Sequence, residues 1–498
     1  MNERWRSVKQ KTMNKNAAHN KEDLFMISKN EKTPELEPIP KSIMNIAWIL
    51  VLGAIMPLLD STMVNIAIKH LSNDFGIGLD LIQWVITGYV LSMAISVPLA
   101  GWMVQRFNGK WLMIGANILF LATSIASGFS GSIHSLLIFR IVQGFSAGFI
   151  ITLVTTLCVE VAGRDRMGRM MSTIGIPTVL GPILGPVIGA VIVQFLSWRY
   201  IFFVNIPIGI LAITMMILKL PNFTPANIKA KFDFIGIILL GASSAALIYG
   251  ITKAAKNATF NNSTTIGYVV AGVVILAIYI IYAAIKKEQA ILPLHLFKSK
   301  SFSAVMVGLF LAGIATNGPM LLLPLFFQNI KGFSVLSAGL ILIPQGIGML
   351  VSRPLIGKLT DKLGARNVVL VSLTLAIVGT IPFVFFNEAS SLIVVSVVLF
   401  VRGIGIGGIT LPMMTDAYTG MVKQEIAQAS VGTRVVQNIG GAFGSAVLAT
   451  VVSLSIQGKV PTIPLMTTAY HDGFMLALVL SLVLIIPALF LTNKKSKK

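Results

Sequence analysis

The sequence predicts an all-α integral membrane protein, and three observations lead to this fold class. Of the 498 residues, 55% are hydrophobic and 11% are charged, whereas soluble proteins are about 25% charged. Apolar segments long enough to cross a bilayer recur from residue 44 to residue 492. The first of them contains Asp60, and an ionisable side chain at membrane depth is costly and is a functional candidate by default.

The apolar segments predict fourteen transmembrane helices in a six, two, six arrangement. The expected spans are 44–68, 81–104, 111–129, 134–158, 167–193, 198–218, 233–252, 266–285, 302–327, 334–356, 367–387, 391–415, 427–452 and 472–492. The chain then divides into a disordered cytoplasmic tail, an N-terminal six-helix bundle, two additional helices with linkers, a C-terminal six-helix bundle and a basic cytoplasmic tail. These parts are 1–41, 42–220, 221–300, 301–493 and 494–498. The additional pair lies outside both six-helix bundles and is expected at their periphery.

The net charge of +21 is explained by where the basic residues lie. With the amino terminus in the cytoplasm, most Lys and Arg residues fall in the inward-facing segments and the final tail. The outward-facing segments hold only Lys69, Arg199, Lys253, Lys256, Lys331 and Lys459. This distribution follows the positive-inside rule, so both termini are predicted to be cytoplasmic. No nucleic-acid partner is needed to account for the charge.

Residue types that build other kinds of site are scarce in the sequence. Cys158 is the single cysteine, which excludes a disulfide framework and a multi-cysteine metal site. The five histidines are scattered without metal-binding spacing, and no GxxxxGK[ST] phosphate loop is present. We therefore predict no metal, no cofactor and no enzymatic activity, and we expect a monomer.

An internal repeat supports the division into two six-helix halves. The loop segment 101–110, GWMVQRFNGK, is echoed by 357–366, GKLTDKLGAR, at an offset of 256 residues. Arg140 and Gly144 in the fourth span are echoed by Arg402 and Gly403, with an offset of 262 residues between the two arginines. Two parallel halves around a central cavity is the architecture of one large class of transporters.

The second copy of the loop segment and several motifs elsewhere in the chain fit known sequence patterns. The loop residues Gly357, Asp361, Lys362, Gly364 and Arg366 fit the pattern Gly-x-Leu-x-Asp-Arg-x-Gly-Arg-Arg/Lys. Other motifs are DSTMVNIA at 60–67, WVITGYVL at 84–91, Arg140-x-x-Gln143-Gly144, Gly181-x-x-x-Gly185-Pro186-x-x-Gly189 and WRYIFFVNIPIG at 198–209. Together they resemble the major facilitator superfamily, and within it the fourteen-helix drug–proton antiporters. The matching motifs cover nearly the whole spanning region.

The resemblance implies gating roles for residues of the loop motif and of the fifth-helix motif. These residues are Gly101, Arg106, Gly181, Gly185, Pro186, Gly189, Gly357, Asp361, Lys362 and Arg366. The first loop copy departs from the pattern, because Gln105 replaces the acid and Asn108 replaces the turn glycine. Asn adopts a positive φ more readily than most residues, so we expect the turn to survive. The fifth-helix glycines recur every four residues and form one face, which favours close helix packing, a functional hinge or both.

Asp60 and Arg140 are expected at a similar depth in the membrane. Asp60 lies eight residues before the outer end of its span, and Arg140 lies six residues after the start of its own. At ~1.5 Å per residue these positions are about 12 Å and about 9 Å from the outer surface. We therefore predict that the two side chains pair, directly or through water. Proton coupling and a permanent structural clamp are both open interpretations, and the hydroxyls of Ser61 and Thr62 leave Na⁺ coupling open as well.

The last six helices carry no equivalent acid. The 256-residue offset carries Asp60 to Thr316, and Arg402 lies near mid-depth without an evident acidic partner. Aromatic rings attract cations and Met side chains adapt to varied shapes, so such residues suit lipophilic cations. The candidate substrate-binding residues are Asn65, Gln83, Trp84, Tyr89, Asn317, Met320, Phe327, Gln328 and Arg402.

The sequence therefore predicts a proton-coupled antiporter that exports lipophilic, cationic drugs or toxic compounds across a bacterial cytoplasmic membrane by alternating access. Asp60 and Arg140 are the expected coupling pair, and the expected partners are protons, small-molecule substrates and the lipid bilayer. One alternative keeps the fold but exports a lipid, a siderophore or an endogenous antibiotic, with Arg402 facing an anionic group. The other is a non-transporting receptor or a membrane enzyme, although no catalytic cluster supports an enzyme.

Overall fold

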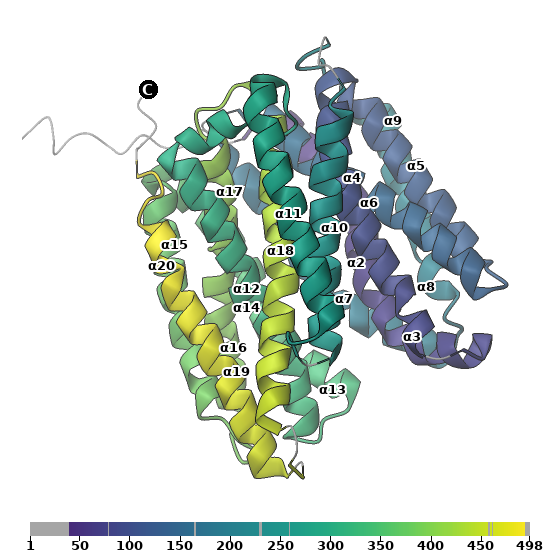
Figure 1. Ribbon diagram of the computed structural model, residues 1–498, viewed down its shortest axis with the longest axis vertical. Helices are drawn as coiled ribbons and strands as arrows, with labels where there is room; N and C mark the ends of the chain where they lie inside the picture. The colour runs from purple at the N-terminus through teal and green to yellow at the C-terminus, as the bar shows by residue number, and fades with distance from the viewer. Residues whose placement is uncertain are drawn as a thin grey trace, which may run out of the picture. The chain divides into compact units, whose positions relative to one another are not determined.

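The computed structural model describes residues 39–77, 79–163, 166–228, 232–257, 259–456, 459–460 and 462–493. Within these ranges all regular secondary structure is helical, as the integral-membrane prediction requires (Figure 1). The predicted tails lie outside them, apart from residues 39–41.

The helices follow one another along the chain with short connections. The first group is α2 (Lys41–Phe75), α3 (Leu79–Ile82), α4 (Trp84–Arg106), α5 (Gly109–Gly128), α6 (Ile133–Ala162), α7 (Met167–Phe195), α8 (Tyr200–Phe203) and α9 (Asn205–Lys219). The middle group is α10 (Phe234–Asn257), α11 (Ser263–Lys286) and the 3₁₀ turns Lys287–Gln289 and Leu294–Lys298. The last group is α12 (Lys300–Asn329), α13 (Val335–Leu340), α14 (Ile343–Leu363), α15 (Ala365–Thr380), a 3₁₀ turn (Ile381–Val384), α16 (Leu392–Gly407), α17 (Thr410–Tyr418), α18 (Lys423–Ile456), α19 (Ile463–Val483) and α20 (Ile485–Ala488).

Thirteen helical segments of the described chain are long and apolar enough to cross a membrane. They coincide with thirteen of the predicted spans. The remaining span, 167–193, coincides with the 29-residue helix α7, of which some side chains lie outside the described part, so the total of fourteen stays a prediction. The last span begins at Ile463 and not at 472. Its polar start is helical because the Thr462 hydroxyl caps the helix by accepting from the Leu465 N–H at 3.4 Å, and Pro464 suits the first turn.

The two copies of the loop motif form their turns differently. Gly364 ends α14 with a φ of +83°, a left-handed conformation that favours glycine. Asn108 has a φ of −65°, and its side chain caps α5 by accepting a hydrogen bond from the Lys110 N–H at 2.9 Å. The expectation that Asn108 substitutes for glycine at positive φ is therefore wrong. The turn survives because an asparagine is also a good N-cap.

Glycines bring the backbones of α4 and α6 into direct contact. A Cβ atom on Gly144 would overlap the backbone of Tyr89 and the side chain of Ser92. One turn later, a Cβ on Gly148 would overlap the backbone of Met93. Close approach through small residues is the usual way to pack helices in a membrane, where lipid removes the hydrophobic drive between them. This contact places Tyr89 beside Arg140, four residues before Gly144 and on the same face of α6.

The inserted helices α10 and α11 pack against each other, and they differ in what else they contact (Figure 1). Helix α10 packs against both α4 and α18, so it contacts both six-helix groups. Leu247 and Ile251 of α10 form a small apolar cluster with Ala446 of α18. Helix α11 exposes most of its apolar side chains, and it fits the predicted peripheral position better than α10 does.

We predict that Gly144→Val lowers the stability of the protein because the added side chain forces α4 and α6 apart. Overpacking a close contact costs roughly 1–3 kcal/mol, so the midpoint of thermal unfolding in detergent should fall. Gly115→Val in α5 is the matched control, because nothing lies within 4 Å of a Cβ at that position. Equal midpoints for the two variants would contradict the packing argument.

Candidate functional site

A buried ion pair joins the first and fourth spans. Asp60 of α2 accepts a hydrogen bond from Nη1 of Arg140 in α6, and the two residues are 0% and 1% exposed. The same Nη1 donates to Oε1 of Gln143 at 2.9 Å, and the Gln143 amide donates back to Asp60 at 3.5 Å. The two charges thus meet as their predicted depths indicate. Neither reaches water, so each depends on the other and on Gln143 for stabilisation.

Two further elements hold the Arg140 guanidinium in place. Its Nε donates to the Val85 carbonyl of α4 at 3.3 Å, and its Cζ lies 4.1 Å from the centre of the Tyr89 ring. A cation over an aromatic face is attracted by the ring quadrupole. The Tyr89 hydroxyl donates to the Pro57 carbonyl of α2 at 3.2 Å, which ties this ring to the helix that carries Asp60. On another side, the Phe202 ring lies 5.7 Å from the same Cζ.

Helix α7 packs on the segment of α2 that carries Asp60. Cβ atoms on Gly181, Gly185 and Gly189 would crowd α2 at Leu58, Thr62 and Met63. The Thr62 hydroxyl donates to the Gly181 carbonyl at 3.1 Å. The predicted glycine face therefore serves close packing here, while its role as a hinge stays a prediction. The side chain of Pro186 lies outside the described part.

The second half contains a buried arginine with neutral partners. Arg402 of α16 is 2% exposed. Its Nη1 donates to Oε1 of Gln345 in α14 at 2.7 Å, and its Nε donates to the Thr380 hydroxyl of α15 at 3.1 Å. Among the described residues, no carboxylate pairs with it.

The predicted substrate-binding residues are placed in several environments. Trp84 stacks on Tyr249 of α10 with ring centres 5.5 Å apart. Tyr89 is packed against Arg140, and Phe327 is fully buried among aromatic rings at one end of α12. The exposed residues are Asn65, Asn317 and Met320, and the half-buried residues are Gln83 and Gln328. The structure does not gather these side chains into one described pocket, and their roles stay predictions.

The two halves are joined at the end of the bundle that carries the loop motifs, here called the basic end. Asp361 of α14 accepts hydrogen bonds from the backbone N–H groups of Gly168 at 2.7 Å and Arg169 at 3.3 Å, both in the first turn of α7. It also pairs with Nε of Arg169 at 3.0 Å. The carboxylate therefore caps a helix of the opposite half, where the positive end of the helix dipole favours an anion. The Ser172 hydroxyl adds a 2.6 Å bond to the Arg353 carbonyl.

Helix α18 makes the second connection between the halves. The hydroxyls of Thr156 in α6 and Ser430 in α18 lie 3.1 Å apart, and Arg434 donates to the Thr155 hydroxyl. Gly101 of the first loop motif lies directly against Val431. Side-chain hydrogen bonds thus join 42–220 and 301–493 at both connections. These bonds involve residues within about 17 Å of the basic end, at ~1.5 Å per helical residue, so the bundle is closed there.

The other predicted gating residues lie at the same end of the bundle. Gly357 lies against the backbone of Gly168 and Arg169, so it belongs to the α7–α14 connection. Arg106 lies near the Trp102 ring, 5.8 Å from its centre. Lys362 is exposed and Arg366 is half-buried at the start of α15. The gating roles of these residues stay predictions.

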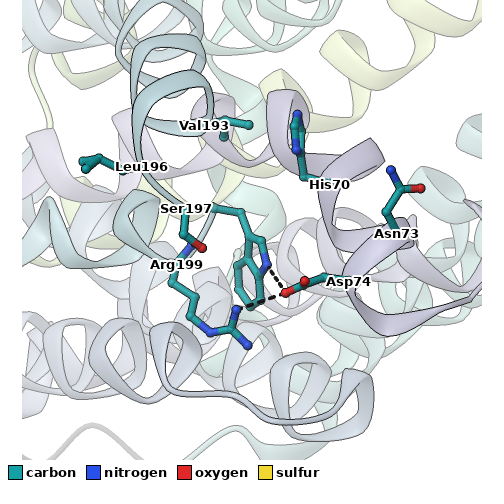
Figure 2. Close-up of a pocket in the computed structure, with 8 residues that line it drawn as sticks. His70, Asn73, Asp74, Val193, Leu196, Ser197 and Arg199 are labelled. Carbon is teal, nitrogen blue, oxygen red and sulfur yellow. Dashed lines mark hydrogen bonds and ion pairs between the residues drawn. The ribbon is translucent and has the colours of Figure 1, made fainter.

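A polar pocket of about 360 Å³ lies at the end opposite the basic end (Figure 2). It is lined by His70, Asn73, Asp74, Val193, Leu196, Ser197, Trp198 and Arg199. Asp74 accepts hydrogen bonds from the Trp198 indole at 2.8 Å and from Arg199 at 3.0 Å, and these bonds hold the pKa of its carboxyl below the usual range. Asp74 follows Asp60 by fourteen residues in the same helix, or about 21 Å. None of the predicted binding residues lines this pocket.

Comparison with known proteins identifies the fold. The sequence profile of the Major Facilitator Superfamily matches residues 50–445. The chain belongs to this superfamily. It is therefore a multi-pass membrane transporter with the major facilitator fold.

Bacterial relatives of this superfamily member carry multidrug-resistance names. The multidrug resistance protein B homolog of Mycobacterium tuberculosis (strain ATCC 25618 / H37Rv) is 29% identical over 409 residues, which cover 82% of this chain and 76% of that protein. The putative multidrug resistance protein MdtD of Escherichia coli O9:H4 (strain HS) is 28% identical over 355 residues, covering 68% and 74%.

Solved structures share the fold at lower identity. The human organic anion transporter MFSD10 (TETRAN) superposes with a TM-score of 0.62 at 15% identity, covering 89% of this chain and 100% of that chain. The proton:xylose symporter XylE superposes with a TM-score of 0.59 at 14% identity, covering 89% and 96%. At these identities the likeness concerns the fold alone.

Two residues of the ion-pair site were not singled out from the sequence. Gln143 lies in the Arg140-x-x-Gln143-Gly144 motif, and its spacing of three residues already places its side chain beside Arg140 on a helix. Asn205 lies in the 198–209 motif, close to Asp60, and its amide donates to the Ser124 hydroxyl at 2.9 Å. Only the fold brings Asn205 to this position, because it follows Asp60 by 145 residues.

We predict that Asp361→Asn loosens the α7–α14 connection, because it removes the negative charge that accepts the α7 N–H groups and Arg169. Hydrogen bonds to charged groups contribute about 1.5–3 kcal/mol, so opening at the basic end should become at least about ten times more frequent. A Thr360→Cys reporter, buried in this contact, would then react faster with a soluble maleimide. Lys358→Gln, an exposed change on the same helix, should leave the rate unchanged. Unaltered labelling in the Asp361 variant would show that the carboxylate does not hold this end closed.

We predict that Asp74 stabilises the opposite end only above acidic pH. Its pKa is lowered in the folded protein, so its contribution is present above the unfolded pKa of about 3.9 and is lost as the pH falls through the lower folded value. Asp74 is half exposed, so Asp74→Asn should cost at most about 1 kcal/mol at neutral pH. Unfolding midpoints of wild type, Asp74→Asn, Arg199→Gln and the double variant give the coupling between the two residues. If the coupling free energy between Asp74 and Arg199 stays constant as the pH is lowered, the stabilising role of the Asp74 carboxylate is contradicted.

Proposed function

We propose that this transporter is a proton-coupled antiporter that exports lipophilic compounds from the cytoplasm of a bacterium. The observation that carries the proposal is the buried pair of Asp60 and Arg140, which is held by Gln143, Val85 and Tyr89. A carboxylate in a membrane interior is rare and is usually part of an ion or proton pathway. The multidrug-resistance names of the bacterial relatives support a lipophilic cargo.

Proton exchange at Asp60 would act directly on the pair. Protonation removes the charge that Arg140 faces and leaves its cation with Gln143, the Val85 carbonyl and the Tyr89 ring. The strength of the link between α2 and α6 then depends on whether a proton is bound. Because α7 packs on α2 at Gly181 and Gly185, a shift of α2 is passed to the helix that Asp361 holds at the basic end.

The closed basic end fits one state of an alternating-access cycle. We propose that this end faces the cytoplasm, as the distribution of Lys and Arg indicates, and that both termini lie on that side. The conformation described here would then be closed to the cytoplasm. Opening requires Asp361 to release the first turn of α7 and Arg434 to release Thr155.

The expected cationic cargo rests on Asp60 as a counter-ion and stays a prediction of this proposal. A second candidate, export of compounds that carry an acid group, is favoured by Arg402, which has only neutral partners. Na⁺ in place of the proton remains an outcome of the transport assay, because Ser61 and Thr62 flank Asp60.

We predict that Asp60→Asn reduces pH-gradient-driven transport by at least tenfold, because the amide cannot exchange a proton. The assay is uptake of ethidium, a lipophilic cation, and of a neutral lipophilic dye into proteoliposomes with an imposed pH gradient. Asp472→Asn removes an exposed acid of α19 that bonds Ser455, and it should transport normally. Replacing the pH gradient by a Na⁺ gradient tests the alternative ion.

The Asp60 variant leaves Arg140 as an unpaired buried charge, which can cost about 3–5 kcal/mol of stability. The double variant Asp60→Asn/Arg140→Gln removes both charges and keeps the test valid if the single variant fails to fold. If a folded double variant still transports both dyes at the wild-type rate when the pH gradient drives transport, the pair is a structural clamp and not a proton site.

A further inference from the structure

One partner of Arg402 and one partner of Arg140 lie at equivalent places in the internal repeat. Gln345, which accepts from Nη1 of Arg402, follows Tyr89 by 256 residues. Thr380, which accepts from Nε, follows Ser124 of α5 by the same 256 residues, although Ser124 itself bonds the Phe202 carbonyl and Asn205. Helix α6 packs mainly on α4 and α5, as α16 packs mainly on α14 and α15. Arg402, 262 residues after Arg140, therefore lies on the helix of the second half that corresponds to α6.

The carboxylate of the first half has no counterpart beside Arg402. The residue 256 positions after Asp60 is Thr316 of α12, and its hydroxyl donates to the Ala312 carbonyl of its own helix at 2.7 Å. Helix α2 packs on α6, and α12 packs on α17, which continues the span of α16. The second half thus keeps the arginine but has no acid at the position that corresponds to Asp60.

Arg402 retains hydrogen-bonding capacity that the protein does not use. An arginine has five N–H donors and stays charged in proteins. Two donors are bonded, to Gln345 and Thr380, so three have no partner among the described residues. The Nη2 of Arg402, which makes no hydrogen bond, keeps some accessible surface. A buried cation with free donors in a membrane interior favours an anionic partner.

Two further arginines make the interior of the second half positive. Arg353 of α14 is 8% exposed, and its Nε is buried without a hydrogen-bond partner. The Nε of Arg434 in α18 is likewise buried and unbonded. In the described part of the chain, none of these three arginines forms an ion pair with a carboxylate. The second half also buries the carboxylate of Asp416, which is hydrogen-bonded to Ser301 and Thr492 near the basic end. Its three arginines still outnumber this acid, whereas Asp60 neutralises Arg140 in the first half.

We propose that Arg402 binds an acid group, a carboxylate or a phosphate, on the compound that is transported. The acid group of the cargo occupies the place that Asp60 occupies beside Arg140, and the fork of N–H donors on Arg402 suits two-point binding of such a group. This inference rests on the proposed export function and names a substrate class for it. It assigns cargo binding to the second half and proton exchange to the first half.

Binding to the purified full-length protein tests the proposal without a gradient. The probes are three forms of one fluorescent aryl compound that end in a carboxylate, in its methyl ester and in a trimethylammonium group. The carboxylate should bind more tightly than the ester. Arg402→Gln should weaken carboxylate binding by about ten- to a hundredfold, the range expected for a charged hydrogen bond. It should leave the ester and the cation unchanged, and Arg402→Lys should restore part of the loss.

Controls separate this site from general charge effects and from the coupling pair. Arg199→Gln removes a surface arginine that pairs with Asp74 and should not alter binding of any probe. Asp60→Asn/Arg140→Gln should abolish gradient-driven transport while keeping the preference for the carboxylate, so failure of the export proposal is distinguishable. Chloride is titrated alone to detect a site for a free inorganic anion.

Three results would overturn the proposal. The first is equal affinity of the wild-type protein for the carboxylate and the ester. The second is an equal loss for all three probes in a folded Arg402→Gln variant, which would make Arg402 a structural residue. The third is stabilisation by chloride that depends on Arg402 without any preference for the carboxylate probe.

Discussion

The low dielectric of the membrane interior makes every buried charge in this protein depend on a partner. In the first half the requirement is met within the chain, because Asp60 and Arg140 neutralise each other and Gln143 and Tyr89 complete their contacts. In the second half Arg402 is buried without such an acid. The arginine of the first half is thus neutralised by a carboxylate, whereas the corresponding arginine of the second half is bonded only to neutral groups. That asymmetry is the basis for the proposal that the first half exchanges a proton and the second half receives a charged group.

Close packing between helix backbones determines how a change at the Asp60–Arg140 pair can affect the rest of the protein. Gly144 lets α4 approach α6, and Gly185 lets α7 approach α2, so the ion pair is enclosed by helices that touch through their main chains. Main-chain contacts of this kind leave little room for independent side-chain adjustment. A change at Asp60 is then transmitted as a movement of whole helices. Asp361 caps the first turn of α7, so α7 contacts both the helix that carries Asp60 and the closed basic end.

Much of this arrangement could be predicted from the sequence, and the failures have physical causes. Hydrophobic length located thirteen described spans, and helical rise alone placed Asp60 and Arg140 at one depth. The start of the last span was missed because hydrophobic length does not register the polar helix start, which Thr462 caps and Pro464 follows. The turn at Asn108 was misassigned because asparagine serves both as an N-cap and as a left-handed residue. Asn205 was missed because only tertiary packing brings it to Asp60, and the scattered aromatic candidates show that residue type alone does not indicate which face of a helix lines a cavity.

The position of α10 gives this transporter an asymmetric boundary between its halves. This helix packs on α4 of one half and on α18 of the other, which also contact each other, whereas α7 and α14 meet at the other seam without an inserted helix. A rigid helix cannot remain packed on two bodies that move apart, so separation of the halves along α10 would expose the apolar surface that it covers. Rotation with α10 near the axis keeps that surface buried and concentrates the displacement at α7 and α14. Helix α10 would thus lie at the axis about which the two halves rotate, and the opening would form on the opposite side, between α7 and α14.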